Sequence, residues 1–261
     1  MTLTRNLNII IPRLLLIVVL FISALQSAQA QQWKVRRYEI FGGVSANSLF
    51  GDLGGYPTGQ NLFGLKDIQI GGLRPGVQLG MRYKISSKVW LKGYLSYNQY
   101  ATSDKGSHND ARGFASTSVG YGTGLQVEYA FITEDRRKGR IVFDRKGLLS
   151  SSGTMAAYVF SGVKGMYFKP VLTAPIVVSP NETITTYSFA FVLPIGIGYK
   201  FFISRKTSIG FEFSANFTTT DLLDGYTSSF SKSNDFYYQL NACVAYKIYT
   251  KRNGSPSFNR R

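Results

Sequence analysis

The sequence predicts an all-β fold, an eight-stranded antiparallel transmembrane β-barrel that follows an N-terminal signal peptide. Three observations lead to this prediction: an export signal at the start of the chain, alternation of apolar and polar residues over eight later segments, and aromatic residues at both ends of the apolar faces. The composition agrees, because aromatic residues reach 15% of the 261 residues while charged residues make up only 17%.

Residues 1–30 have the three parts of a secretory signal peptide. Arg5 and Arg13 form the basic region, residues 14–25 form the apolar core, and Ala28-Gln29-Ala30 is a small-x-small cleavage site. The apolar core is shorter than the roughly 20 residues that a spanning helix needs, so an N-terminal membrane anchor is disfavoured. We expect cleavage between Ala30 and Gln31. Residues 31–249 then form the outer-membrane barrel, and 250–261 form a basic periplasmic tail.

Eight later segments alternate with the period of a β-strand. The clearest runs from Val119 to Phe131, with glycines on its polar face. A soluble β-sandwich would alternate too, but its strands average five or six residues, and these segments are about ten or longer. Aromatic residues such as Tyr121 and Tyr129 flank the apolar faces, which is typical of outer-membrane barrels. The segments are 38–47, 77–85, 89–98, 119–131, 156–167, 188–201, 208–217 and 238–248.

The polar faces of the predicted strands point into the lumen and carry both signs of charge. Buried charges are tolerated only when they are paired or hydrated, so balanced signs predict an ion-pair network across a filled lumen. Paired catalytic carboxylates are the alternative, and they are disfavoured because each acid has candidate basic partners. The predicted network is Glu39, Arg82, Lys92, Glu128, Lys164 and Glu212, and the residues expected to fill the lumen are Phe41, Trp90, Tyr94, Tyr158 and Phe160.

Basic residues give the chain a net charge of +16, and the predicted topology gathers them at one rim. An even number of strands places both ends of the mature chain in the periplasm, together with the basic segments. Neutralisation of lipid head groups is one explanation for a basic rim. Segment 132–153 is long for a periplasmic turn, however, and we expect Arg136, Arg137, Lys138 and Arg140 within it to dock a partner.

Enzymatic chemistry has little support in the sequence. The single His, His108, lies beside Ser107 and Asp110, which suggests a hydrolase, but catalytic triads normally assemble from separate segments rather than from one loop. A single Cys excludes a disulfide scaffold and a cysteine-built metal site. We therefore expect no catalytic residues, no metal and no cofactor. Export argues against a nucleic-acid partner.

Several short motifs resemble those of the PorG-like outer-membrane barrels of Bacteroidetes. They are Tyr38-Glu39-Ile40, residues 47–53 (NSLFGDL), Arg74-Pro75 leading to Arg82-Tyr83, Ala111-Arg112, residues 128–131 (EYAF) and residues 220–224 (TDLLD). Leu222 stands where that family usually has Tyr, and the insert 132–153 is atypical. The resemblance implies a non-enzymatic outer-membrane barrel, and it marks as family-motif residues of the loops Gly51, Asp52, Leu53, Arg112, Asp221 and Asp224.

The same resemblance implies a function, because PorG-like barrels include a component of the type IX secretion system that associates with a ring of periplasmic proteins. We therefore expect a structural or docking component of an envelope assembly such as the type IX secretion system, located in the cell outer membrane. Its expected partners are outer-membrane lipids and periplasmic secretion-system proteins. Two alternatives stay open: a stand-alone small OmpX/OmpA-like barrel for adhesion or envelope integrity and, with less support, a lipid-modifying barrel enzyme.

Overall fold

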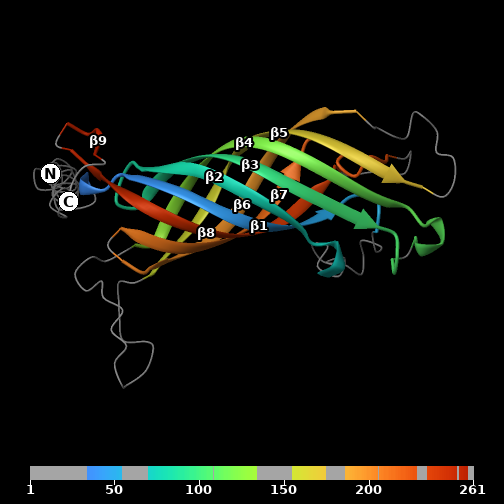
Figure 1. The fold of residues 1–261 in the computed structure, drawn as a ribbon, viewed down its shortest axis with the longest axis horizontal. Helices are drawn as coiled ribbons and strands as arrows, with labels where there is room; N and C mark the ends of the chain where they lie inside the picture. The colour runs from blue at the N-terminus through green and yellow to red at the C-terminus, as the bar shows by residue number, and fades with distance from the viewer. Residues whose placement is uncertain are drawn as a thin grey trace, which may run out of the picture.

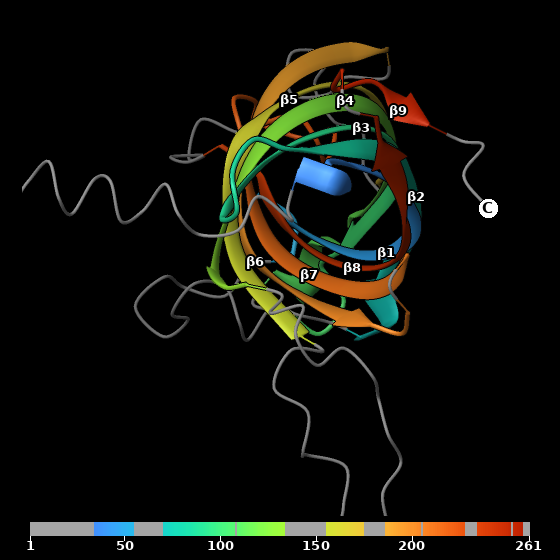
Figure 2. The ribbon, with the colours of Figure 1, turned by 90° about the vertical axis from the view of Figure 1, so that its left-hand side faces the viewer.

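Eight long strands pair in sequence order, and the first also pairs with the last, so the sheet closes on itself (Figures 1 and 2). The computed structural model describes residues 34–54, 70–107, 109–133, 155–174, 186–204, 206–227, 234–251 and 253–257. All of these pairings are antiparallel, and the predicted eight-stranded barrel is confirmed. The strands are β1 (Tyr38–Phe50), β2 (Arg74–Lys84), β3 (Val89–Ser103), β4 (Ala115–Ile132), β5 (Met155–Thr173), β6 (Ser188–Phe202), β7 (Thr207–Thr218) and β8 (Phe236–Thr250).

The two ends of the barrel differ. At one end lie the start of β1, the end of β8 and tight turns such as the one in which the Ile85 N–H donates to the Val89 carbonyl (2.9 Å). We call this end the periplasmic rim and the opposite end the outer rim, following the predicted topology. The outer rim carries two 3-10 helices, η4 (Ile70–Gly72) and η5 (Asp110–Arg112). No helix in the described ranges is long and apolar enough to cross a membrane.

The sequence does not predict a ninth short strand at the periplasmic rim. β9 (Pro256–Ser257) folds back on the end of β8 and pairs Ser257 with Tyr249, after a turn in which Gly254 has a φ of 85°. The Tyr38 hydroxyl donates to the Gly254 carbonyl (3.1 Å), which ties this hairpin to the start of β1. Part of the expected tail, 250–261, is therefore folded onto the barrel end.

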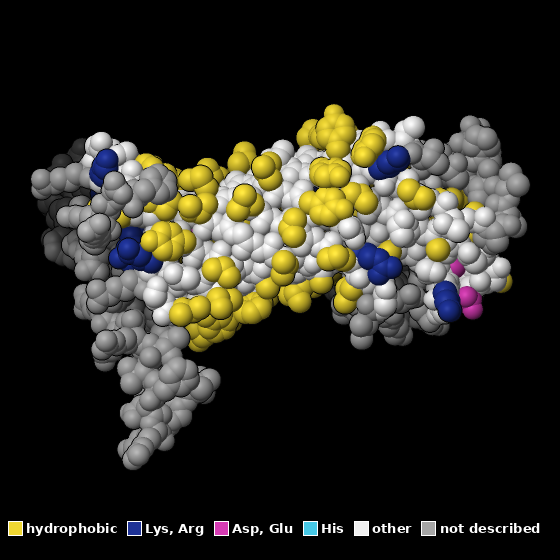
Figure 3. Space-filling model, in the orientation of Figure 1, with side chains coloured by type: hydrophobic (Ala, Val, Ile, Leu, Met, Phe, Trp, Pro, Cys, Tyr) yellow, Lys and Arg dark blue, Asp and Glu magenta, His cyan; other side chains and the backbone are white. Residues whose placement is uncertain are grey.

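Alternation along the strands gives the barrel an apolar exterior. Outward side chains such as Leu95, which is 63% exposed, gather into an apolar band between the rims (yellow in Figure 3). Aromatic pairs lie toward both rims, with ring centroids 5.1 Å apart for Tyr38 and Tyr83 and 5.2 Å apart for Tyr97 and Tyr121. An apolar surface of this extent is unfavourable in water, and it matches the lipid-facing band of transmembrane barrels.

Large inward side chains face glycines on neighbouring strands, so the narrow lumen is filled without clashes. A Cβ at Gly124 would lie 2.6 Å from the Tyr94 ring, and a Cβ at Gly198 would collide with Tyr158. The glycines that alternate along β4 and β6 therefore make space for aromatic rings, as small and large residues do in other narrow barrels.

Candidate functional site

A buried cluster of charged side chains, centred on Arg82, crosses the periplasmic half of the lumen. Arg82 is 2% exposed and donates from Nη1 to Glu39 Oε1 (2.8 Å), from Nε to Glu128 Oε1 (2.8 Å) and from Nη2 to Glu212 Oε1 (2.6 Å). A guanidinium suits this role because it presents five N–H donors in one plane. One side chain thereby connects β2 with β1, β4 and β7.

Two lysines and a tyrosine complete the lumen cluster. Lys92 Nζ lies 2.6 Å from Glu212 Oε2, and Lys200 Nζ lies 3.1 Å from Glu39 Oε1. The Tyr158 hydroxyl donates to Glu212 Oε1 (2.7 Å). The carboxylates and cations of the cluster balance, which compensates the cost of taking these charges out of water.

The structure brings together the residues of the predicted network with the exception of Lys164. The Lys164 ammonium lies closer to the outer rim and donates to the Tyr237 hydroxyl (3.1 Å). Lys200, which the predicted network does not include, joins the cluster instead. Its inward parity along β6 is the signal that identifies it. Alternation along a strand determines which face of the sheet a side chain occupies, whereas the stagger between strands determines which charged side chains lie close together.

Aromatic rings and apolar side chains fill the lumen around these charges. The Arg82 guanidinium carbon lies 4.3 Å from the centroid of the Phe41 ring, and Lys200 Nζ lies 3.8 Å from the centroid of the Trp90 ring. A cavity beside Glu39 has a volume of about 10 Å³, which is room for no more than one water molecule. Toward the outer rim the lumen is filled by Leu49, Tyr100, Met166, Phe168, Ala190, Val192, Leu223 and Tyr237.

A second polar cluster joins the loops of the outer rim. The Leu53 N–H, just beyond β1, donates to Asp224 Oδ2 (3.3 Å), and the Tyr226 N–H donates to Asp224 Oδ1 (3.0 Å). Asp235, directly before β8, accepts from the Leu223 N–H (2.7 Å). These bonds tie the β7–β8 loop to the end of β1. We call the cluster the outer clasp, and it comprises Gly51, Asp52, Leu53, Asp104, Arg112, Asp224 and Asp235.

Arg112 joins a third loop to the outer clasp. Its Nε and Nη2 pair with the two carboxylate oxygens of Asp104 (2.7 and 3.0 Å), and Nη2 also donates to the Asp52 carbonyl (3.0 Å). Asp104 accepts in addition from the Gly54 N–H (3.0 Å). Sequence reasoning singled out Arg112 but missed Asp104 and Asp235. Asp104 directly follows β3 and Asp235 directly precedes β8, and this position beside a strand end is the sequence signal that could have identified them.

Two carboxyl groups of the clasp face the same small space. A Cβ at position 51 would lie 2.5 Å from both Asp224 Oδ2 and Asp235 Oδ1, so this space accepts only a glycine. Burial, with the charges of Asp52 and Asp221, raises the pKa of Asp224 to about 7. Burial and the Asp224 charge raise the pKa of Asp235 as well. The pair is therefore suited to holding a proton. Within the described ranges, no cluster of three or more His, Cys, Asp and Glu residues is placed to hold a metal ion.

Other predicted site residues lie outside the described ranges. These are the cleavage position Ala30–Gln31, His108, and the docking candidates Arg136, Arg137, Lys138 and Arg140. The two described members of the Ser-His-Asp hypothesis make local loop contacts: the Ser107 hydroxyl donates to the Asp104 carbonyl (2.7 Å), and Asp110 accepts from the Gly106 N–H (3.3 Å).

Comparison with known proteins gives matches among solved structures. No protein-family model and no curated protein sequence matches the chain. The chain is similar to Ail, the attachment invasion locus protein of Yersinia pestis, in complex with the heparin analogue sucrose octasulfate (12% identity, 82% of this chain and 99% of that chain, TM-score 0.44). It is also similar to Neisserial surface protein A (11% identity, 81% and 97%, TM-score 0.42). A third is a major outer membrane protein from Thermus thermophilus (12% identity, 81% and 99%, TM-score 0.42).

These similarities are too low to carry a functional inference, and the fold assignment rests on the strand pairing of this chain itself. The resemblance to PorG-like barrels stays a prediction.

The lumen cluster predicts that Arg82→Met is strongly destabilising, because it leaves three buried carboxylates short of a cation. Breaking a buried ion pair costs about 3–5 kcal/mol. The measurement is the urea midpoint of unfolding in lipid vesicles, followed by tryptophan fluorescence. Lys169→Met, which removes a cation at the outer end of β5, is the matched control. Equal midpoints for the two variants would show that the cluster does not stabilise the barrel.

The outer clasp predicts that the outer loops loosen as the pH rises. An unfolded Asp has a pKa of about 3.9, below the folded value of Asp224, so the clasp binds more protons than the unfolded loop. Its stability therefore falls from about pH 4 upward and is lowest above about pH 7. Amide hydrogen exchange of Leu53, Leu223 and Tyr226, corrected for intrinsic rates, should show more protection at pH 5 than at pH 8.

Asp235→Asn should remove this pH dependence, because an amide at position 235 can donate to Asp224 without a shared proton. Asp110→Asn, in a neighbouring loop, is the control and should leave the pH dependence intact. Protection that does not change with pH in the unmodified protein contradicts a protonated clasp.

Proposed function

We propose that the protein is a non-conducting, non-enzymatic β-barrel of the outer membrane that docks a periplasmic assembly, such as the type IX secretion system. The observation that carries the proposal is a set of exposed lysines on the turns of the periplasmic rim: Lys88, Lys206 and Lys251. The filled lumen supports it indirectly, because it leaves the two rims as the surfaces on which a partner can act.

The location in the outer membrane follows from two features taken together. The apolar band of the barrel requires a lipid environment. The expected signal peptide over residues 1–30 directs the chain out of the cytoplasm. Closed barrels that follow an export signal are typical of the bacterial outer membrane.

Two turns of the periplasmic rim repeat one motif, Ile-Ser-x-Lys, which supports a common role for their lysines. In the first turn, the Ser86 hydroxyl accepts from the backbone N–H groups of Lys88 (3.3 Å) and Val89 (3.1 Å). In the β6–β7 turn, the Ser204 hydroxyl likewise accepts from Lys206 (3.1 Å) and from the residue after it. The serine fixes each turn, and each lysine side chain is exposed at the barrel end.

The expected partner is a protein with an acidic surface. The basic residues of the insert, Arg136, Arg137, Lys138 and Arg140, add to the same rim in the predicted topology. Charge complementarity of this kind speeds association and makes it sensitive to salt, since the Debye length is about 8 Å at physiological ionic strength.

A stand-alone role at the cell surface is the second candidate, and the outer clasp favours it. Arg112, Asp104, Asp224 and Asp235 bind several loops together, so the outer rim presents an ordered surface on which adhesion or envelope contacts can form. If Asp224→Ala abolishes adhesion or weakens the envelope while the recovery of periplasmic partners is unchanged, the second candidate is favoured over docking.

Co-purification of cross-linked periplasmic proteins at low and high salt tests the docking proposal. Two variants are compared with the unmodified barrel: Lys88→Ser/Lys206→Ser/Lys251→Ser, and the fourfold replacement of Arg136, Arg137, Lys138 and Arg140 by Ser. We expect partner recovery to fall at least several-fold in either variant and at high salt, while folding is retained.

The control is Lys105→Ser/Lys169→Ser, which removes two basic residues at the outer rim and should leave recovery unchanged. Recovery that responds neither to the substitutions nor to salt contradicts electrostatic docking. The basic rim would then serve to neutralise lipid head groups.

A further inference from the structure

The barrel wall has a gap at the outer rim, because β2 is the shortest of the eight long strands. β1 pairs with β2 only as far as Asn47, but it pairs with β8 as far as Phe50. β3 pairs with β2 only as far as Asn98, but it pairs with β4 as far as Ser103. Among the described residues, no strand therefore lies between the outer ends of β1 and β3.

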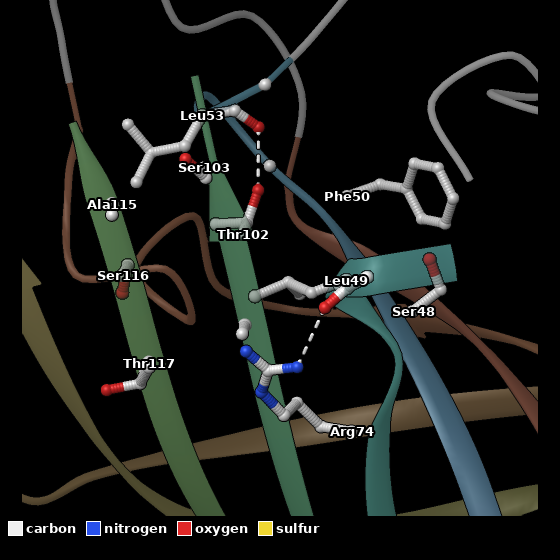
Figure 4. Close-up of a pocket in the computed structure, with 15 residues that line it drawn as sticks. Ser48, Leu49, Phe50, Leu53, Arg74, Thr102, Ser103, Ala115, Ser116 and Thr117 are labelled. Atoms are coloured by element: carbon white, nitrogen blue, oxygen red, sulfur yellow. Dashed lines mark hydrogen bonds between the residues drawn. The ribbon is translucent and has the colours of Figure 1, made fainter. Parts of the chain in front are cut away.

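A cavity of about 200 Å³ occupies this gap, and we call it the rim cavity (Figure 4). Side-chain hydrogen bonds hold its two ends: the Asn47 amide donates to the carbonyls of Arg74 (3.2 Å) and Gln99 (3.3 Å), and the Thr102 hydroxyl donates to the Leu53 carbonyl (3.0 Å). These hydrogen bonds hold the two sides of the gap together. Its apolar lining comes from Leu49, Phe50, Leu53, Ala101 and Ala115.

The Arg74 guanidinium at the rim cavity has N–H donors that no group in the described ranges accepts. Arg74 Nη1 donates to the carbonyls of Gly71 (3.0 Å) and Leu73 (3.1 Å), and no carboxylate in the described ranges pairs with the guanidinium. Its Nε and Nη2 form the side-on fork that binds carboxylates in a bidentate manner.

We propose that the rim cavity binds a small amphipathic carboxylate. The carboxylate pairs with the Arg74 guanidinium, and the apolar body of the ligand packs on Leu49, Leu53 and Ala101. The size agrees, because an apolar cavity of about 150 Å³ holds benzene, so one of this volume holds a ligand of roughly ten non-hydrogen atoms. This site is independent of docking at the periplasmic rim.

An anionic group that pairs with the Arg74 guanidinium could belong to a soluble carboxylate or to an anionic lipid of the surrounding bilayer. The test distinguishes these two sources. The probe is 3-phenylpropionate, and its uncharged analogue is 3-phenylpropan-1-ol. Binding of each is measured by calorimetry on the barrel in nanodiscs of zwitterionic phosphatidylcholine, with empty nanodiscs as the blank for partitioning. Repetition in nanodiscs with anionic phosphatidylglycerol shows whether lipid competes.

We expect the carboxylate to bind the unmodified barrel about tenfold more tightly than the alcohol, which is the contribution of one charge-assisted pair. Arg74→Gln should remove this tenfold preference and leave alcohol binding unchanged. Ala101→Phe should fill the cavity and abolish binding of both probes. Lys169→Gln, which removes a cation elsewhere at the outer rim, should behave like the unmodified barrel.

Each variant is first checked for folding by its shift in gel mobility on heating. Equal binding of the two probes, unchanged carboxylate binding in Arg74→Gln, or unchanged binding in Ala101→Phe overturns the proposal. Loss of probe binding only in anionic nanodiscs assigns the site to a bilayer lipid and overturns the assignment to a soluble carboxylate. None of these results depends on a periplasmic partner, so docking is tested separately.

Discussion

The rest of the barrel depends on the pairing of Arg82 with Glu39, Glu128 and Glu212. These carboxylates come from three strands and lie 43, 46 and 130 residues from Arg82 in the chain. A one-residue slip of any strand would turn its charged side chain from the lumen to the lipid face, where an unpaired charge is very costly. The lumen cluster therefore stabilises one register of the closed sheet over its neighbours, besides contributing to stability.

Because packing and ion pairs fill the lumen, we propose that the two rims carry the function. At the outer rim, Gly51 allows Asp224 and Asp235 to approach and tie the β7–β8 loop to the end of β1. The rim cavity lies where β2 begins, short of the outer ends of its neighbours. At the periplasmic rim, serine-fixed turns hold lysines outward, and β9 packs against the end of β8. Each of these features lies at a strand end, where the regular pairing of the closed sheet stops.

The sequence was sufficient to predict the eight strands and the inward face of each, because period 2 is a local property that needs no knowledge of neighbours. It was not sufficient to predict which charges meet. Lys164 and Lys200 both have inward parity, and only the stagger between strands places Lys200 beside Glu39. The same holds for Asp104 and Asp235, for β9 and for the rim cavity, since each depends on contacts between distant segments.

Conductance in planar lipid bilayers tests the central claim, a barrel closed by its own lumen side chains, most directly. The purified protein, inserted at neutral pH and compared with a detergent-only blank, should give no steady single-channel current, because Phe41, Trp90 and Tyr158 pack around the Arg82 cluster. A reproducible, steady single-channel conductance of the unmodified protein would contradict the account. Solute passage, rather than binding at the rims, would then be the function to explain.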